Sequence, residues 1–258
     1  MEKTDQERQQ APSPVIVEKG EDPRVLVIAF TGFASALMMT PFDFFQVSGL
    51  LKYSRILLRD DTKRCFLGGL PPIAESFAQL LDWIRARIRD LAPEKILAIG
   101  TSAGAGTAMM AGHELKVDFT HAFSPYTFMD MPNIVKYNTE SLVPQYTRYL
   151  EHIWALPAEV HKYFDTAELL KTGNGVTRHY VHVCKKSPLD MLRARHVSHC
   201  PNVKVFAYDC SDHFVTQHLA DWKQLLTLLK IENQENLGRV LRVRPEVAGG
   251  IPKEKAEP

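Results

Sequence analysis

The sequence predicts an α/β fold in which a mostly parallel sheet is flanked by helices and interrupted by a helical insertion. Short, almost wholly apolar runs recur along the chain, at residues 24–30, 53–58, 95–99, 118–124, 177–183 and 203–208. Runs of this length without polar alternation are typical of strands that are buried on both faces, as in parallel sheets. Amphipathic stretches of helical period lie between several of them, which favours crossover helices.

Composition narrows the possible classes of function. The chain has 258 residues, enough for one large domain, and its 45% hydrophobic and 24% charged content is that of an ordinary globular protein. A formal net charge of +1 argues against a nucleic-acid or anionic-membrane partner. No run approaches the length of a membrane span, and the first residues contain no apolar segment typical of a signal peptide.

The four cysteines, at positions 65, 184, 200 and 210, form no C-x-x-C pair and no zinc-ligand pattern with the histidines. We therefore expect a reduced cytoplasmic protein with no metal and no cofactor.

The first half of the chain alternates strands and helices after a polar leader. Residues 1–23 are expected to be a flexible leader, and the domain then runs over 24–232. Arg24–Phe30 predicts the first strand, Phe42–Leu51 a helix and Tyr53–Leu58 the second strand. Ile73–Leu91 predicts an amphipathic helix whose arginines form a solvated face. Its apolar stripe contains Ile73, Phe77, Leu80, Leu81, Ile84 and Ile88.

No strand pattern occurs between positions 126 and 175, which is long for a connection inside a compact domain. We interpret this aromatic, proline-broken segment as short helices that form a cap over the site. An ordinary crossover helix with a long approach is the alternative. A cap would exclude water and give a substrate pocket its aromatic wall, to which we assign Tyr126 and Trp154.

The last part of the chain returns to strands. Thr177–Val183 and Val203–Tyr208 predict strands, with a helix around Arg193–His199 between them. Phe214–Ile231 predicts one amphipathic helix with Trp222 on its inward side. Residues 233–258 are polar and basic and are expected to be a flexible tail.

The strand Lys95–Ile99 leads into the most informative motif of the sequence. Gly100-Thr-Ser-Ala-Gly104 fits G-x-S-x-G and is followed by small, helix-forming residues. In a strand–turn–helix context this motif holds a serine, here Ser102, on a strained turn with its hydroxyl clear of the sheet. The helix N-terminus would then place the Ala103 amide beside an oxyanion.

The same segment also fits G-x-x-x-G-x-G, through Gly100, Gly104 and Gly106, which is a dinucleotide-binding turn of short-chain dehydrogenases. Those enzymes carry the turn on the first strand and use a Tyr-x-x-x-Lys pair. At least two strands precede the turn here, and none of the eight tyrosines has a lysine four residues later. The serine interpretation is therefore preferred.

A second glycine loop follows the first strand. In a hydrolase with the serine turn, the loop after such an early strand supplies the second oxyanion-hole N–H group. Gly32 would allow close approach of the backbone and of a substrate, and the donor would be the amide of Phe33 or Ala34. A glycine that only turns the chain is the alternative.

The order of these features resembles the α/β-hydrolase superfamily, over roughly residues 24–231. RILLRD, GTSAGAG and AFSPYTF are also similar to segments of bacterial α/β-hydrolase-like proteins. The resemblance implies a histidine base just before the last helix, a position that His213 occupies. It also implies an acid after the strand Thr177–Val183. Ser187 stands where the family has its aspartate, so Asp190 is the candidate, with an N-terminal helix charge as its alternative role.

The resemblance implies Ser-His-Asp chemistry on a small acyl substrate, an ester or thioester that can be carrier-bound, by hydrolysis or acyl transfer. Two other classes stay open. One is a lyase or cyclase that uses the serine–histidine pair for proton transfer on the same scaffold. The other is a non-catalytic binding or accessory protein.

Overall fold

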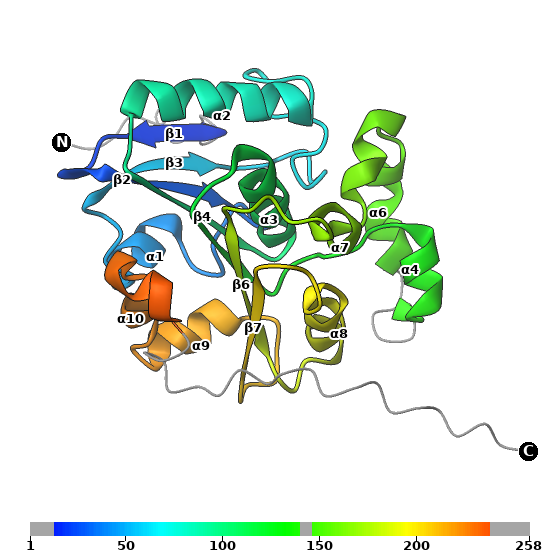
Figure 1. The fold of residues 1–258 in the computed structure, drawn as a ribbon. Helices are drawn as coiled ribbons and strands as arrows, with labels where there is room; N and C mark the ends of the chain where they lie inside the picture. The colour runs from blue at the N-terminus through cyan, green and yellow to red at the C-terminus, as the bar shows by residue number, and fades with distance from the viewer. Residues whose placement is uncertain (1–12, 140–145, 238–258) are drawn as a thin grey trace, which may run out of the picture.

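The computed structural model describes residues 13–139 and 146–237, and a seven-stranded sheet forms its centre (Figure 1). The strand order is β1-β3-β2-β4-β5-β6-β7. Strands β2 to β7 are parallel, and β1 pairs with β3 in the antiparallel direction at one edge. The strands are β1 Val15–Glu18, β2 Asp22–Phe30, β3 Tyr53–Leu58, β4 Lys95–Thr101, β5 Phe119–Phe123, β6 Arg178–Cys184 and β7 Val203–Tyr208.

Helices cover both faces of this sheet (Figure 1). One face packs against α2, α3 and α8, and the other against α1, α9 and α10. The α-helices are α1 Pro41–Val47, α2 Phe77–Leu91, α3 Ala103–Leu115, α4 Met131–Lys136, α6 Tyr146–Trp154, α7 Thr166–Leu170, α8 Pro188–Val197, α9 Val215–Asp221 and α10 Leu225–Leu229. Two 3₁₀ helices are η1 Ala158–Tyr163 and η2 Ile231–Asn236. In the part of the chain that the structure describes, none of the helices is both long and apolar enough to cross a membrane.

Strand β2 shows why the predicted strands lack polar alternation. Its successive side chains point to opposite faces, so Leu26 and Ile28 enter the core under α2 and α3, while Val27 and Ala29 enter the core under α1 and α10. Both faces are buried, so both sets of positions must be apolar. The mostly parallel α/β sheet predicted from the sequence is confirmed.

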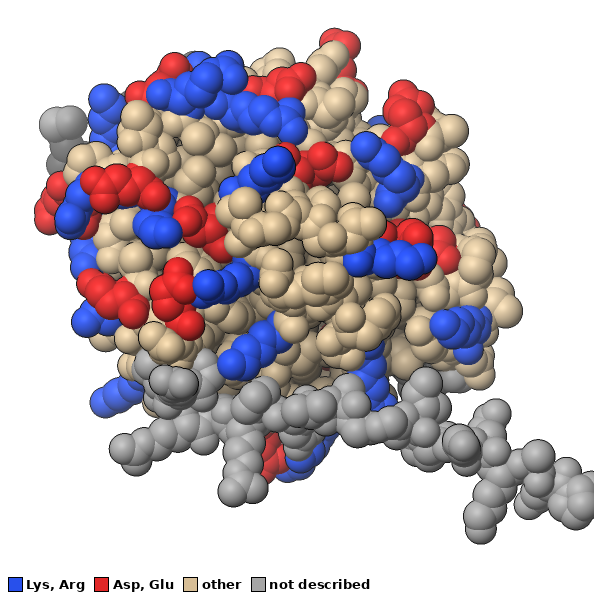
Figure 2. Space-filling view, viewed as in Figure 1, with Lys and Arg blue, Asp and Glu red and all other residues tan. Residues whose placement is uncertain are grey.

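Helix α2 begins at Phe77, later than the predicted Ile73. The side chain of Ser76 accepts a hydrogen bond from the Gln79 amide and so caps the helix. Ala74 is instead held in an isolated bridge to Leu70. The exposed face of α2 carries the ion pairs Arg85–Asp82 and Arg87–Asp90, and Figure 2 shows charges of both signs there.

Both ends of the predicted domain need correction. Residues assigned to the leader form β1 and the start of β2, because Val15–Glu18 pair with Arg55–Leu58 of β3. At the other end, Gln234 and Leu237 are buried within the segment assigned to the tail. Residues 1–12 and 238–258 lie outside the described residues.

The predicted helix over 214–231 is two helices, α9 and α10. Lys223 adopts a positive φ of 58°, which ends the first helix and redirects the chain. Trp222, at the end of α9, is therefore 41% exposed, whereas the prediction placed it on the inward side of the helix.

The segment 126–175 contains α4, α6, η1 and α7, and α4 and α6 extend to one side of the sheet (Figure 1). Within its described residues, the only β pairing is the bridge between Phe128 and Asp165. Leu150, Ile153 and Tyr163 pack in the same core as α2 and α3. The expected short helices are present, and a cap over the site stays a prediction, with residues 140–145 outside the described part.

A chain of buried hydrogen bonds runs through the face under α9 and α10. Tyr208 Oη lies 2.9 Å from His182 Nδ1, His182 Nε2 lies 3.0 Å from His121 Nδ1, and His121 Nε2 lies 2.7 Å from Gln234 Oε1. The Gln234 amide nitrogen donates to two backbone carbonyls, so its oxygen must accept from His121. His121 and His182 therefore both carry their proton on Nε2. His182 Nδ1 accepts the hydrogen bond that the Tyr208 hydroxyl donates at the other end.

Burial keeps these imidazoles neutral. It lowers the pKa of His121 to about 4 and the pKa of His182 well below its ordinary value. The network is consistent with neutral rings, because each imidazole donates one hydrogen bond from its N–H and accepts one at its other nitrogen.

Two of the four cysteines are joined, contrary to the expectation of a fully reduced protein. Cys184, at the end of β6, forms a disulfide with Cys210 in the loop after β7. Their Cα atoms are 4.8 Å apart because β6 and β7 are adjacent parallel strands that end together. Cys65 and Cys200 are buried free thiols.

Candidate active site

Ser102 occupies a sharp turn between β4 and α3, with φ 54° and ψ −121°. This conformation is strained for a residue with a side chain, and such strain is found at functional sites. The flanking glycines allow the turn to pack. A Cβ on Gly100 would lie 2.1 Å from the Gly104 carbonyl oxygen, and one on Gly104 would lie 2.3 Å from the Thr31 carbonyl oxygen.

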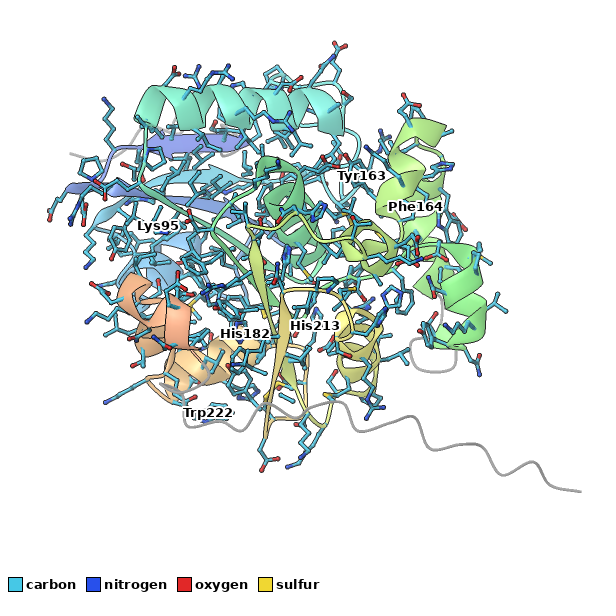
Figure 3. The ribbon with its side chains drawn as sticks, in the orientation of Figure 1. Lys95, Tyr163, Phe164, His182, His213 and Trp222 are labelled. Carbon is cyan, nitrogen blue, oxygen red and sulfur yellow. A yellow bond between two sulfur atoms is a disulfide. The ribbon has the colours of Figure 1, made fainter. Side chains whose placement is uncertain are left out.

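The three residues assigned to the triad meet at the carboxyl ends of the strands. His213 Nε2 lies 2.8 Å from Ser102 Oγ. His213 Nδ1 lies 2.9 and 3.0 Å from the two carboxylate oxygens of Asp190. The Asp190 side chain is 2% exposed and that of His213 is 35% exposed, so Asp190 is sheltered while His213 is partly open to solvent. Figure 3 labels His213 between strand β7 and helix α8.

Asp190 reaches the histidine because of how α8 begins. Ser187 occupies the N-cap position and Pro188 the first helical turn, which suits proline because no N–H is needed there. Asp190 follows in the same turn and points inward. The other carboxylates beside His213 are engaged elsewhere, Asp209 with Lys186 at 2.7 Å and Asp212 with His218 at 3.0 Å.

A buried arginine that the sequence analysis did not assign lies beside Asp190. Arg193 is 1% exposed, and its Nη1 is 3.9 Å from Asp190 Oδ1. Its guanidinium also stacks over the Tyr126 ring at 3.7 Å from the centroid. The signal in the sequence was the three-residue spacing from Asp190, which places both side chains on one face of a helix.

The amides assigned to the oxyanion hole lie around Ser102. The Ser102 amide itself donates to the Phe123 carbonyl oxygen, whereas Ala103 is the first residue of α3. A Cβ on Gly32 would be 3.4 Å from Ser102 Cβ, so its loop lies against the turn. Among the described residues, the amides of Ala103, Phe33 and Ala34 have no hydrogen-bond acceptor.

The two aromatic residues assigned to the pocket have different surroundings. The Tyr126 amide donates to the Ser102 carbonyl oxygen at 3.3 Å, and its ring meets Phe33 edge-to-face at 5.8 Å. Trp154 packs against the core under α2 and α3 and donates its indole N–H to the Met129 carbonyl oxygen at 2.6 Å. The structure thus brings Tyr126 to the serine turn and gives Trp154 a contact inside the segment 126–175.

The dinucleotide interpretation of the glycine turn conflicts with the packing. A Cβ on Gly106 would lie 2.2 Å from the Tyr126 carbonyl oxygen. Backbone therefore covers the glycine that would have to approach a pyrophosphate.

Solved structures of other proteins share the fold of this chain. No family model matches the sequence, and no curated protein matches it significantly. Among solved structures, an alpha/beta hydrolase enzyme from the metagenome of lagoon sediments of Mar Chica, Morocco, is similar at 15% identity and a TM-score of 0.52, over 88% of this chain and 97% of that one.

Two further structures are comparable. A putative esterase from Staphylococcus aureus has 12% identity and a TM-score of 0.53, with 88% of each chain covered. A hydrolase from Oleispira antarctica has 15% identity and a TM-score of 0.50, over 87% of this chain and 95% of that one. Together with the strand order and the serine turn, these similarities identify the chain as one with the α/β-hydrolase fold.

Proposed function

We propose that this protein is a serine-dependent hydrolase or acyltransferase that acts on an ester or thioester. The observation that carries the proposal is the continuous contact from Ser102 Oγ through His213 to the buried carboxylate of Asp190, with the serine on a strained turn. The solved hydrolases and esterases of the same fold support this class of chemistry.

The geometry suits acyl-enzyme chemistry. Ser102 Oγ would attack the acyl carbonyl carbon while its proton moves to His213 Nε2. Asp190 would hold Nδ1–H and stabilise the imidazolium that forms. His213 would then return the proton to the departing alcohol or thiol, and a water molecule or another acceptor would release the acyl group by the reverse sequence.

The negative charge of the tetrahedral intermediate would be held by the amide of Ala103 and that of Phe33 or Ala34. These donors are fixed by a helix N-terminus and by a loop packed against the serine turn. Removal of one such donor typically costs on the order of 100-fold or more in kcat. The ring of Tyr126 would border the acyl group, since it lies beside Phe33 and the turn.

The test is reaction of the purified protein with a fluorophosphonate, followed by intact mass, beside Ser102→Ala and His213→Ala. His152→Gln, an exposed histidine on α6, is the matched control. We expect one adduct on the wild type and on the control, and none on the two site variants. Hydrolysis of p-nitrophenyl esters and acyl thioesters would then identify the acyl class.

Two results would count against the proposal. A wild-type serine without an adduct, in a protein that also hydrolyses neither panel, would favour a binding protein. An activity that survives Ser102→Ala but not His213→Ala would favour proton-transfer chemistry on the same scaffold.

A further inference from the structure

A second group of reactive side chains lies close to the triad but is separate from it. Cys184, Cys210 and His218 each offer one ligand atom, and these three atoms lie within 4.8 Å of one another. They come from the end of β6, the loop after β7 and helix α9. We call this group the Cys–His cluster. No short motif joins its members, since Cys184 is 26 residues from Cys210.

The environment of the cluster resembles a metal site in its donors and its outer contacts. Two sulfurs and one imidazole nitrogen are the donors that Zn²⁺ prefers. Asp212 lies 3.0 and 3.1 Å from His218 Nε2, so it fixes the ring and leaves Nδ1 available to a metal. A carboxylate on the far nitrogen is the usual outer contact of a metal-bound histidine.

We propose that the dithiol form of this protein binds one Zn²⁺ ion through Cys184, Cys210 and His218. In a tetrahedral site with metal–sulfur bonds of about 2.3 Å, the ligand atoms are about 3.3–3.8 Å apart. The three ligand atoms, which lie within 4.8 Å of one another, are thus already near the spacing of such a site. A water molecule would complete the coordination.

The disulfide and the metal site are two states of the same sulfur atoms. In the structure Cys184 and Cys210 are joined, which excludes both as thiolate ligands. A two-electron reductant such as a dithiol would convert the disulfide into two thiols and become a disulfide itself. Binding of Zn²⁺ would then displace the two thiol protons. A peroxide or a diazene would take two electrons from the thiolates, and two protons from solvent, to become water and alcohol or a hydrazine, which re-forms the sulfur–sulfur bond and releases the ion.

The position of the cluster gives both states a similar structural role. Cys210 precedes the base His213 by three residues, and Cys184 precedes the acid Asp190 by six. The Lys186 amide also donates to the Cys210 carbonyl oxygen at 3.0 Å, so the two loops already run together. Either a disulfide or a metal ion would tie the loop of the acid to the loop of the base.

Access to the cluster is from one side. Cys184 is fully buried and Cys210 is 6% exposed, whereas the side chain of His218 is 30% exposed. An ion would thus enter past His218 and Asp212.

The test is titration of the full-length protein with Co²⁺, which reports tetrahedral thiolate coordination by its near-ultraviolet charge-transfer and visible bands. The same wild-type chain is prepared in two states, reduced with a phosphine under argon and oxidised with diamide. We expect the reduced protein to develop both bands with one equivalent of Co²⁺ and to lose them when Zn²⁺ is added. The oxidised protein should show neither band.

Variants assign the ligands. Cys184→Ser and Cys210→Ser should each weaken the charge-transfer band, and Asp212→Asn should lower the affinity on the order of 10- to 100-fold. Cys65→Ser and Cys200→Ser are the matched controls and should leave the spectrum unchanged. Equal binding by the reduced and oxidised wild type, or no tetrahedral spectrum from the reduced wild type, would overturn the proposal without any variant. Fluorophosphonate labelling is a separate readout, so failure of either proposal is recognisable alone.

Discussion

Asp190→Asn is the perturbation that tests the triad assignment most directly. Both carboxylate oxygens lie within 3.0 Å of His213 Nδ1, and the side chain is 2% exposed, so water cannot replace it. The amide keeps the shape of the carboxylate but removes the charge that stabilises an imidazolium. It can also present an N–H group to Nδ1 and so favour the wrong tautomer. In a serine protease the same change lowers kcat by about 10⁴.

That factor corresponds to about 5.4 kcal/mol of transition-state stabilisation, at 1.36 kcal/mol for each factor of ten. We expect a loss of about 10³- to 10⁴-fold here, because the burial and the two short contacts match that arrangement. The assay is the second-order rate of fluorophosphonate labelling, together with ester hydrolysis if the wild type shows it. Thermal unfolding by circular dichroism confirms that the variant is folded.

The matched control is Asp209→Asn. Asp209 also lies near His213 in sequence, but its carboxylate is 79% exposed and pairs with Lys186. Exposed pairs contribute little, so we expect labelling within about twofold of the wild type. A folded Asp190→Asn protein that loses less than about tenfold would refute the assignment of the acid.

Three further outcomes concern stability. Burial lowers the pKa of His121 to about 4 and that of His182 well below 6.5, so below pH 6.5 the unfolded chain binds more protons than the folded one. The urea concentration at the midpoint of unfolding should therefore decrease as the pH is lowered from about 6.5 to 4. Tyr208→Phe should cost about 1–3 kcal/mol in urea unfolding, because it leaves a buried nitrogen of His182 without a donor. Gly104→Ala should cost at least about 1–3 kcal/mol in the same assay, since its Cβ would lie 2.3 Å from the backbone oxygen of Thr31.

Each of these has a result that contradicts it. A urea midpoint that is constant over that pH window would mean that the buried imidazoles titrate normally. Unchanged stability in Tyr208→Phe would remove the direction assigned to the hydrogen-bond chain. Gly68→Ala is the control for Gly104→Ala, because its Cβ would meet side chains and no backbone atom, with Arg64 Cδ at 3.1 Å and Leu156 Cδ2 at 3.3 Å. Equal losses in the two would show that close backbone approach is not the cause.

Much of the fold could be predicted from the sequence because a buried parallel strand leaves a strong local pattern. Tyr53–Leu58 and Val203–Tyr208 were predicted at their observed bounds. Strand β1 was missed because it has only four residues, and its partner, β3, lies far along the chain. The break between α9 and α10 depends on one positive φ at Lys223, where no glycine marks it.

For the candidate site, sequence order alone suggested Ser102, which directly follows β4, and His213, which lies five residues after the end of β7. Asp190 was less certain because its position depends on how α8 begins, which the missing aspartate at 187 obscured. The Cys184–Cys210 bond and the burial of Arg193 depend on which strand ends and helices become neighbours. Contacts of that kind leave no spacing pattern in the sequence.

The chain of hydrogen bonds from Tyr208 to Gln234 also limits how far the protein can be shortened at its C-terminus. Gln234 is the acceptor at its end, and it bonds a histidine that is 113 positions earlier in the chain. A protein that stops after residue 232 would keep every strand but would leave a buried imidazole N–H with no acceptor. One that stops after residue 237 would keep both Gln234 and the buried Leu237. A shortened protein should therefore extend to Leu237, because both Gln234 and Leu237 belong to the buried core.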